Sequence, residues 1–323
     1  MTRYDLLAFG ENMIRLSTRN YERLEQAQTL DFRHGGTEAN VAVALARLGY
    51  QTCWISRLAN NPLGRKIAGE LGQWGVDTSH VIWTDDGRVG LFFLEVGAPP
   101  RASAVLYDRR NSAMSQMTLE DFPWPLLAEA RWLHLTGITA ALSESCYGLV
   151  AESLRRAHEL GLSVSFDVNY RARLWTPEQA RAALEPLCRE ADVVIVTQSD
   201  AARVFGVQGD TPEEMLANLA GRFARRVVAM TLNAQGSVAY DKSSGRFFRA
   251  EPAPVVHTVD RIGTGDAFDA GFIAGCLEGN IARGLALGNA LAALKMTIPG
   301  DYALVSRQEV EELLAGAAGG VNR

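Results

Sequence analysis

The stretch VDRIGTGDAFDAGFIAG, residues 259–275, decides how the rest of this chain is organised. It runs from a short extended segment through a glycine-rich turn into a helix of small residues. The first N–H groups of such a helix have no partner inside it, and they lie at the positive end of its dipole. The turn therefore predicts a pocket for an anion, above all a phosphate, at Gly263, Thr264 and Gly265.

Asp266 is the unexpected residue of this turn, because a carboxylate repels a phosphate. Two explanations are open. A catalytic Asp266 would accept the proton of an alcohol while the neighbouring amides hold the phosphoryl group in transfer. A structural Asp266 would only cap the helix, since aspartate is a favoured N-cap residue.

The helix after the turn favours the catalytic explanation, because it is suited to close packing. Its small residues recur at spacings of three and four, at Ala267, Ala270, Gly271 and Ala274. A second stripe farther along the chain could receive them, at Ala282, Ala286, Asn289 and Ala293. Two helices in such close contact would hold a phosphate-binding loop rigidly.

The composition narrows the class of protein. The chain has 323 residues, of which 47% are hydrophobic and 21% charged, and its net charge is −5. This balance indicates a globular protein and argues against nucleic acid as a partner. No apolar run approaches the ~20 residues that span a membrane. Four scattered cysteines without a CxxC pair indicate buried thiols, no permanent metal site and a cytoplasmic protein.

Short apolar strands alternate with helical segments along most of the chain. Strands are expected at residues 6–10, 52–56, 132–135, 163–167, 193–196 and 227–231. This alternation predicts an α/β fold in three layers, with a mainly parallel central sheet flanked by helices. Two stretches, at about 12–33 and 88–110, instead read as hairpin-like strands. They could form a small β-sheet standing off the main body, or extend one edge of the main sheet.

Polar residues lie where several strands should end, which is where ligands bind on parallel sheets. Tyr107 and Arg109 would share one face of a strand and could bind a carboxylate together; a solvated basic turn is the alternative. Asp167, Asn169 and Arg171 close another strand and would also share a face. They could hold an acid or a phosphate, or form only a cluster of caps and salt bridges.

DRIGTGDAFDAGF, at residues 260–272, resembles the C-terminal signature of the ribokinase-like (PfkB) carbohydrate kinases. The resemblance implies one ribokinase-like domain over residues 1–323, in which the two hairpin stretches form a lid. It also implies that ATP and Mg²⁺ are used. Asp266 would be the general base, and Gly263, Thr264 and Gly265 the anion hole. Near the N-terminus, Gly36 would let the sugar approach the backbone and Asn40 would reach a hydroxyl.

Four further segments resemble the 2-keto-3-deoxygluconate kinase branch of that family: GGTEANVAVALARLG, YDRRNSA, RWLHLTGI and SFDVNYRARLW. This resemblance implies that Tyr107, Arg109 and Arg171 bind the carboxylate and hydroxyls of a keto acid. Asn169 would lie in the same substrate site. So would Phe92, which stands where many such kinases carry a tyrosine, so that one hydroxyl contact is missing.

The nucleotide side departs from the family pattern. The N-x-x-E motif becomes Thr197-Gln198-Ser199-Asp200, and the K-x-G-x-x-G motif becomes residues 231–236, TLNAQG. The nucleotide-binding residues implied by the resemblance are Thr197, Asp200, Thr231, Asn233, Gln235, Gly236, Gly263, Gly265 and Asn289. A monovalent cation such as K⁺ is a further candidate at the loop formed by residues 299–301.

The function that these observations favour is ATP-dependent phosphorylation of the terminal hydroxyl of a keto-deoxy sugar acid. Arg15, which stands where fructokinase-like members tend to carry an aspartate, argues against a neutral sugar. A kinase of fructose or ribose and a non-catalytic sugar or nucleotide sensor remain the alternatives. A homodimer or higher homo-oligomer joined through the lid is expected.

Overall fold

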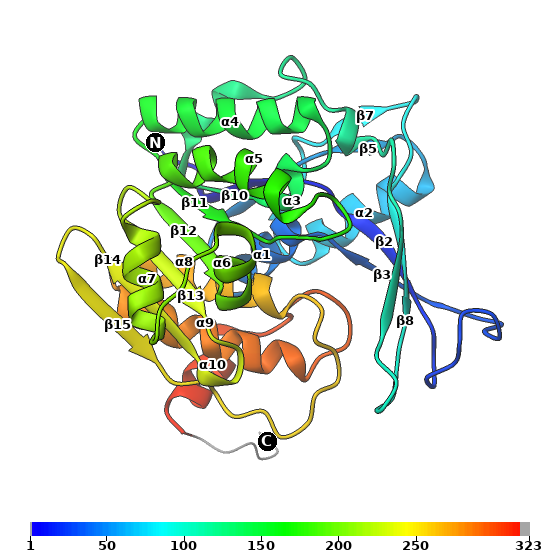
Figure 1. Ribbon diagram of the computed structural model, residues 1–323. Helices are drawn as coiled ribbons and strands as arrows, with labels where there is room; N and C mark the ends of the chain where they lie inside the picture. Colours follow the sequence, from blue (N-terminus) through cyan, green and yellow to red (C-terminus); the bar gives the residue numbers. More distant parts are fainter. Residues whose placement is uncertain (1, 317–323) are drawn as a thin grey trace.

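The computed structural model describes residues 2–316 (Figure 1). Its centre is a nine-stranded sheet in the order β15-β14-β13-β12-β11-β10-β1-β4-β6. The strands from β6 to β13 run parallel: β1 (Tyr4–Phe9), β4 (Thr52–Ile55), β6 (Val76–Asp77), β10 (Ala130–Thr136), β11 (Ser163–Asp167), β12 (Val193–Thr197) and β13 (Val227–Thr231). Two antiparallel strands complete one edge: β14 (Ser237–Asp241) and β15 (Arg246–Ala250). The predicted mainly parallel sheet is therefore confirmed.

Helices cover both faces of this sheet, so the molecule has three layers. Alternate residues of β1 face opposite sides: Leu7 and Phe9 enter one hydrophobic core, and Leu6 and Ala8 the other. The first core is covered by α3 (Gly137–Ala140), α4 (Glu144–Glu159), α5 (Pro177–Glu190), α6 (Gln198–Phe205) and α7 (Pro212–Ala220). The second is covered by α1 (Thr37–Arg47), α2 (Pro62–Gln73), α8 (Thr264–Leu277), α9 (Ile281–Met296) and α10 (Arg307–Leu314).

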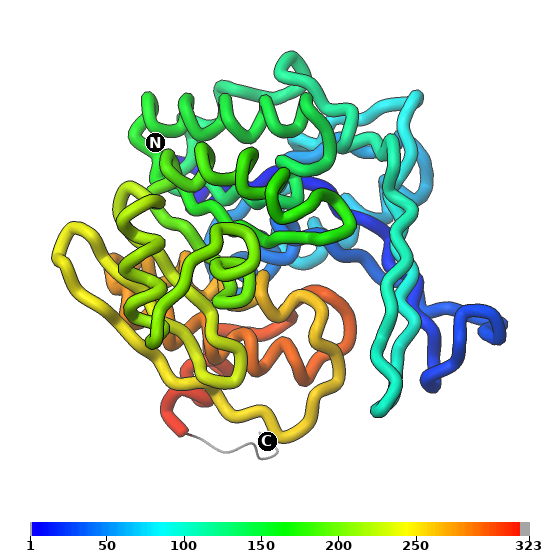
Figure 2. The backbone as a smooth tube through the Cα atoms, viewed as in Figure 1, coloured from blue at the N-terminus to red at the C-terminus, as the bar shows by residue number. Residues whose placement is uncertain are grey.

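A separate four-stranded sheet stands to one side of the body, where Figure 2 shows its blue and teal strands. Its order is β3-β2-β8-β9, from β3 (Asp31–Gly35), β2 (Met13–Ser17), β8 (Leu91–Glu95) and β9 (Ala104–Asp108). The two hairpin-like stretches, at about 12–33 and 88–110, thus pair with one another. The alternative, an extension of one edge of the main sheet, is wrong. A short two-stranded sheet, β5 (Arg57–Ala59) and β7 (Ile82–Thr84), was not expected. Three 3-10 turns complete the elements: η1 (Met114–Gln116), η2 (Trp124–Glu129) and η3 (Asn233–Gln235).

Helices α8 and α9 pack through backbone rather than through alanine stripes. A Cβ on Gly271 would lie 2.5 Å from the backbone nitrogen of Gly288, and a Cβ on Gly275 would lie 2.2 Å from Gly284. The expected receiving stripe on α9 was wrong, because Ala282 is exposed and Ala286 only half-buried. Glycines can approach more closely than alanines, since they carry no side chain that would separate the helices.

The cysteines take no part in cross-links. Cys53, Cys146 and Cys188 are buried, Cys276 is partly buried, and all four are free thiols. Among residues 2–316, no helix has both the length and the apolar character needed to cross a bilayer.

Candidate active site

A cavity of about 400 Å³ lies between the four-stranded sheet and the carboxyl ends of the parallel strands. It brings together most of the residues singled out from the sequence. These are Gly36, Asn40, Phe92, Tyr107, Arg109, Asn169, Arg171, Thr197, Asp200, Thr231, Gly263, Thr264, Gly265 and Asp266. Segments more than 200 residues apart in sequence therefore form one site, which also contains Asp167, Asp269 and Asp301.

Asp266 is a buried carboxylate in the first turn of α8. The helix begins at Thr264, and its N-cap is Gly263, which makes no side-chain capping bond. Asp266 is 7% exposed, and its Oδ2 accepts a hydrogen bond from Nδ2 of Asn40 at 2.5 Å. The capping explanation of Asp266 is therefore wrong, and its side chain lines the cavity instead.

Burial raises the pKa of Asp266 to about 6, while the hydrogen bond from Asn40 and the charge of Arg171 act in the opposite direction. A carboxylate with this pKa is mostly ionised at neutral pH, yet it is a stronger base than an exposed aspartate. The environment of Asp266 therefore suits a general base.

The backbone before Asp266 forms an open cradle. Gly263 has φ +84°, and a Cβ at this position would lie 1.9 Å from the carbonyl oxygen of Asp301. Thr264 N–H donates to the Arg261 carbonyl at 3.3 Å, whereas the N–H groups of Gly265 and Asp266 have no acceptor within the described part of the chain. Such free amides at a helix start can bind a phosphate.

Asp167 reaches the cavity from the last position of a strand, whereas Asn169 reaches it from the loop that follows. Strand β11 ends at Asp167, and Asn169 has φ +41°, a left-handed conformation that favours asparagine among non-glycine residues. Asp167 holds it in place by accepting bonds from the backbone N–H of Asn169 at 3.1 Å and from Nδ2 at 2.7 Å. The expected shared strand face was wrong, although Arg171 also lines the cavity.

Asp269 follows Asp266 by one helical turn and was not predicted as a site residue. It is 2% exposed, and its Oδ2 has no partner among the described residues. Burial, together with the charges of Asp167 and Asp266, raises the pKa of Asp269 well above its usual value. The spacing of three on a helix was the available signal, since it places Asp269 on the same face as Asp266.

Arg109 is not entirely free for a ligand. Its Nε donates to Oε2 of Glu11 at 2.8 Å, and its Nη2 lies against the same oxygen. Glu11 is 5% exposed and lines the cavity, and its Oε1 has no partner in residues 2–316. Glu11 was missed because nothing in the local sequence distinguishes it from an ordinary surface acid. Phe92 and Tyr107 are cross-strand partners on β8 and β9, with ring centroids 6.0 Å apart.

The expected nucleotide residues separate into two groups. Thr197, Asp200 and Thr231 line the cavity. The Thr197 hydroxyl also accepts from the Asp200 N–H at 3.0 Å and so caps α6. The second group lies outside the residues lining the cavity: Asn233, Gln235, Gly236 and Asn289.

Local structure explains two members of the second group. Asn289 Oδ1 accepts from Ser237 at 3.0 Å, while its Nδ2 donates to the carbonyls of Ala250 and Glu251. Gly236 has φ +81°, and a Cβ there would lie 2.1 Å from the Ala250 carbonyl oxygen. Both residues thus contact the end of β15, at the antiparallel edge of the sheet.

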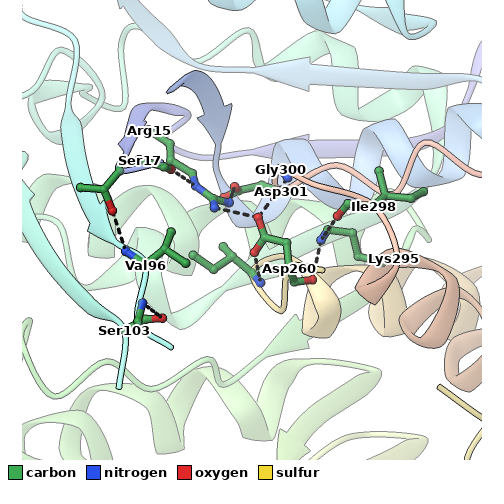
Figure 3. A network of polar contacts seen from close by, with 12 residues as sticks. Arg15, Ser17, Val96, Ser103, Asp260, Lys295, Ile298, Gly300 and Asp301 are labelled. Atoms are coloured by element: carbon green, nitrogen blue, oxygen red, sulfur yellow. Dashed lines mark hydrogen bonds and ion pairs between the residues drawn. The ribbon is translucent and has the colours of Figure 1, made fainter. Parts of the chain in front are cut away.

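A buried charge cluster supports the cradle from behind (Figure 3). Arg15, on β2, donates to Asp301 at 2.6 Å and to Asp260 at 2.7 Å. Lys295 is fully buried, and its Nζ donates to the carbonyl oxygens of Asp260 at 3.1 Å and Ile298 at 3.2 Å. Arg15 therefore pairs with two carboxylates and connects the small sheet to the loop that carries Gly263, while Lys295 adds a second positive charge beside them.

The described residues contain no group of three or more histidine, cysteine, aspartate or glutamate side chains arranged to hold a metal ion. Mg²⁺ sites in proteins commonly combine one or two carboxylates with water and substrate phosphates.

Fold and cavity together define an α/β protein with a polar cavity between the parallel strand ends and a covering sheet, and with a buried carboxylate at a helix start whose amides are free within residues 2–316. The family profile "pfkB family carbohydrate kinase" matches residues 4–307, so the chain belongs to this family of sugar kinases. The resemblance read from residues 260–272 is thereby confirmed.

Several named relatives are kinases of 2-dehydro-3-deoxy sugar acids, and others are named 5-dehydro-2-deoxygluconokinases. The chain is 40% identical over 320 residues to a 2-dehydro-3-deoxygalactonokinase of Haloferax volcanii, with 99% of each chain covered. It is 32% identical to a 2-dehydro-3-deoxygluconokinase of Bacillus subtilis, over 96% of this chain and 95% of that one. A solved 2-dehydro-3-deoxygluconokinase of Thermotoga maritima shares 37% identity and a TM-score of 0.87, over 96% and 99% of the two chains.

Proposed function

We propose that this sugar kinase transfers the γ-phosphoryl group of ATP to the terminal hydroxyl of a 2-keto-3-deoxy sugar acid, of gluconate or galactonate configuration. The observation that carries the proposal is the single cavity that holds a buried base, free helix amides and two arginines. The two relatives cited above support the substrate class, since their names specify 2-dehydro-3-deoxy sugar acids.

The residues of the chain divide the reaction between them. Arg171, Arg109 and Tyr107 hold the carboxylate end of the sugar acid, which directs its far hydroxyl toward Asp266. As the hydroxyl oxygen attacks the γ-phosphorus and the bond to the β-phosphate oxygen breaks, the hydroxyl proton passes to Asp266 Oδ1 or Oδ2. The amides of Gly265 and Asp266 stabilise the negative charge on the transferring group. The four-stranded sheet excludes water and thereby limits ATP hydrolysis.

Nucleotide and Mg²⁺ fit the unpaired amides of α8 and the polar wall formed by Thr197, Asp200 and Thr231. Mg²⁺, held mainly by phosphate oxygens and water, would supply positive charge to the phosphates. Asp200 stands where the N-x-x-E motif of the family has its glutamate. Burial raises the pKa of Asp200. The proposed nucleotide region also includes four residues that support the sheet edge beside it: Asn233, Gln235, Gly236 and Asn289.

A role for K⁺ is tested at the loop of residues 299–301. Lys295 and Arg15 already provide positive charge beside this loop, which supports turnover without added K⁺. Assays in which choline chloride replaces KCl decide the matter. A loss of activity that K⁺ restores would make K⁺ a cofactor, whereas unchanged activity would exclude that role.

The catalytic role is tested with Asp266→Asn. Turnover should fall by about 10²–10⁴-fold, because the amide cannot accept the proton. Circular dichroism and ATP binding should stay unchanged. Asp241→Asn is the matched control, since Asp241 is similarly buried, at 9% exposed, but accepts hydrogen bonds from Ser243 and Ser244 outside the cavity. Near-normal turnover of Asp266→Asn would remove the base assignment.

The substrate class is tested by comparing sugar acids of both configurations with fructose and ribose. Arg171→Gln should raise the KM for the acids and leave that for neutral sugars unchanged. It is a cleaner variant than one at Arg109, whose removal would leave buried Glu11 unpaired. Preference for fructose or ribose would favour a kinase of neutral sugars. Binding of sugar or ATP without release of ADP would favour a non-catalytic sensor.

We further propose a cytoplasmic homodimer joined through the outer face of the small sheet. Phe32, Leu16, Phe93 and Leu106 form one cross-strand row over all four strands. Phe32 and Leu106 are 41% and 56% exposed, which is unusual for a row of large apolar side chains. Sedimentation of Leu106→Glu tests the contact, and a monomeric wild-type protein would refute it.

A further inference from the structure

A second cavity, of about 430 Å³, opens beside the active site between β9 and the loop after β11. Its walls are four arginines, a tyrosine and two leucines: Arg109, Arg110, Arg171, Arg173, Tyr107, Leu106 and Leu174. Tyr107, Arg109 and Arg171 line the inner cavity as well, so the two spaces share a wall. Arg110 and Arg173 line only the outer cavity.

The protein balances only part of the positive charge of this outer cavity: Glu11 pairs with Arg109, and the carboxylates of Asp266 and Asp167 act on Arg171. Within residues 2–316, no carboxylate lies within 4.0 Å of Arg110, Arg171 or Arg173. The nearest acid in sequence, Asp108, is engaged by Arg88 at 2.7 Å, and Glu11 faces Arg109. Guanidinium groups that are only partly balanced repel one another, and an anion placed among them relieves this repulsion. The feature stands out in a chain whose net charge is −5.

We propose that the outer cavity is a capture site for small carboxylate anions on their way to the active site. Arg110 and Arg173 attract the anion, and Arg109 and Arg171 then carry its carboxylate into the inner cavity. Leu174 provides an apolar wall for the carbon chain. This inference rests on the proposed function, because it takes the sugar acid as the captured ligand.

The test uses the double variant Arg110→Gln/Arg173→Gln. At an ionic strength of about 20 mM its kcat/KM for 2-keto-3-deoxygluconate should fall about five- to tenfold, with kcat within about twofold of wild type. At about 0.5 M the difference should shrink below about twofold, because salt screens these charges over a few ångströms. The same loss at both ionic strengths, or no loss, would overturn the proposal.

Arg65→Gln/Arg246→Gln is the matched control. Both arginines are exposed and lack a carboxylate within 4.0 Å among the described residues, yet neither lines this cavity. The control removes the same charge from the whole molecule, so an equal loss of kcat/KM would show a general and not a local effect. That outcome would also overturn the capture site.

Binding of inorganic sulfate separates this inference from the proposed function, since it needs no turnover. Calorimetric titration at low ionic strength should give at least about fivefold weaker sulfate binding in Arg110→Gln/Arg173→Gln than in wild type. If sulfate binding weakens in this way but no sugar acid is phosphorylated, the proposed function is refuted and the anion site is supported. Equal sulfate affinity in the wild type and both variants would refute the site.

Discussion

At the scale of single residues, the proposed base Asp266 depends on the side-chain amide of Asn40. Asn40 donates to Asp266 at 2.5 Å and thereby favours its ionised form. Burial works against ionisation, so the pKa of about 6 is a compromise between the two effects. Replacement of Asn40 should therefore shift the pH dependence of the reaction, although Asn40 itself neither gives nor takes a proton in the proposed mechanism.

Asn40→Ala should move the acidic limb of the kcat/KM profile to higher pH by about one unit. A hydrogen bond to a charged group contributes about 1.5–3 kcal/mol, and one pKa unit corresponds to about 1.4 kcal/mol. The profile is measured from pH 5 to 9. Asn12→Ala is the control, because Asn12 is equally buried but donates to Tyr302. A limb that stays in place would contradict the role assigned to Asn40.

At the scale of helices and strands, the position of the anion cradle depends on the contact between α8 and α9. The backbones meet at glycines, so a side chain cannot be accommodated by a change of rotamer. Arg15 adds a second support, because it fixes the loop before α8 from a strand of the small sheet. The cradle is therefore held by two elements that are far apart in sequence.

Gly271→Ala should lower the free energy of unfolding by about 1–3 kcal/mol, because its Cβ would overlap the backbone of α9. Gly148→Ala is the matched control in the middle of α4, where a Cβ meets nothing within 4 Å. It should stabilise the protein by up to about 1 kcal/mol. Urea denaturation measures both, and equal changes in the two variants would contradict the packing argument.

At the scale of the whole molecule, buried carboxyl groups should decide how stability varies with pH. Burial raises the pKa of Glu38 to about 7 and that of Asp266 to about 6, and it also raises the pKa of Asp167 and Asp269. The folded state therefore binds more protons than the unfolded chain. Stability from these groups is complete below about pH 4 and is lost as pH rises through 6 and 7.

The ligand-free protein should be most stable near pH 5 and lose stability toward pH 8. Each proton contributes about 1.4 kcal/mol per pH unit in that range. Below about pH 4 the paired acids near the surface reverse the trend. Glu152 is one of them: hydrogen bonds from Arg155 and Arg156 lower its pKa to about 2. Urea titrations at several pH values measure this, with Glu38→Gln expected to flatten the slope. A free energy of unfolding that rises from pH 5 to 8 would refute it.

Much of the fold and part of the site could be predicted from the sequence, for physical reasons. Strand and helix periods, and the glycines of residues 263–265, act over a few residues and so are visible locally. Glu11 and Asp301 could not be found as readily, since their places in the site depend on which segments meet in space. Asn169 shows the same limit, because its left-handed backbone breaks the expected strand alternation.

The burial of the thiols has a practical consequence. Cys53 lies in β4, Cys146 in α4 and Cys188 in α5, and each is shielded from solvent. A maleimide reagent can reach them only when the surrounding region opens transiently. The rate at which each cysteine is labelled, read by peptide mass spectrometry, would therefore report the opening of three separate regions without any engineered probe.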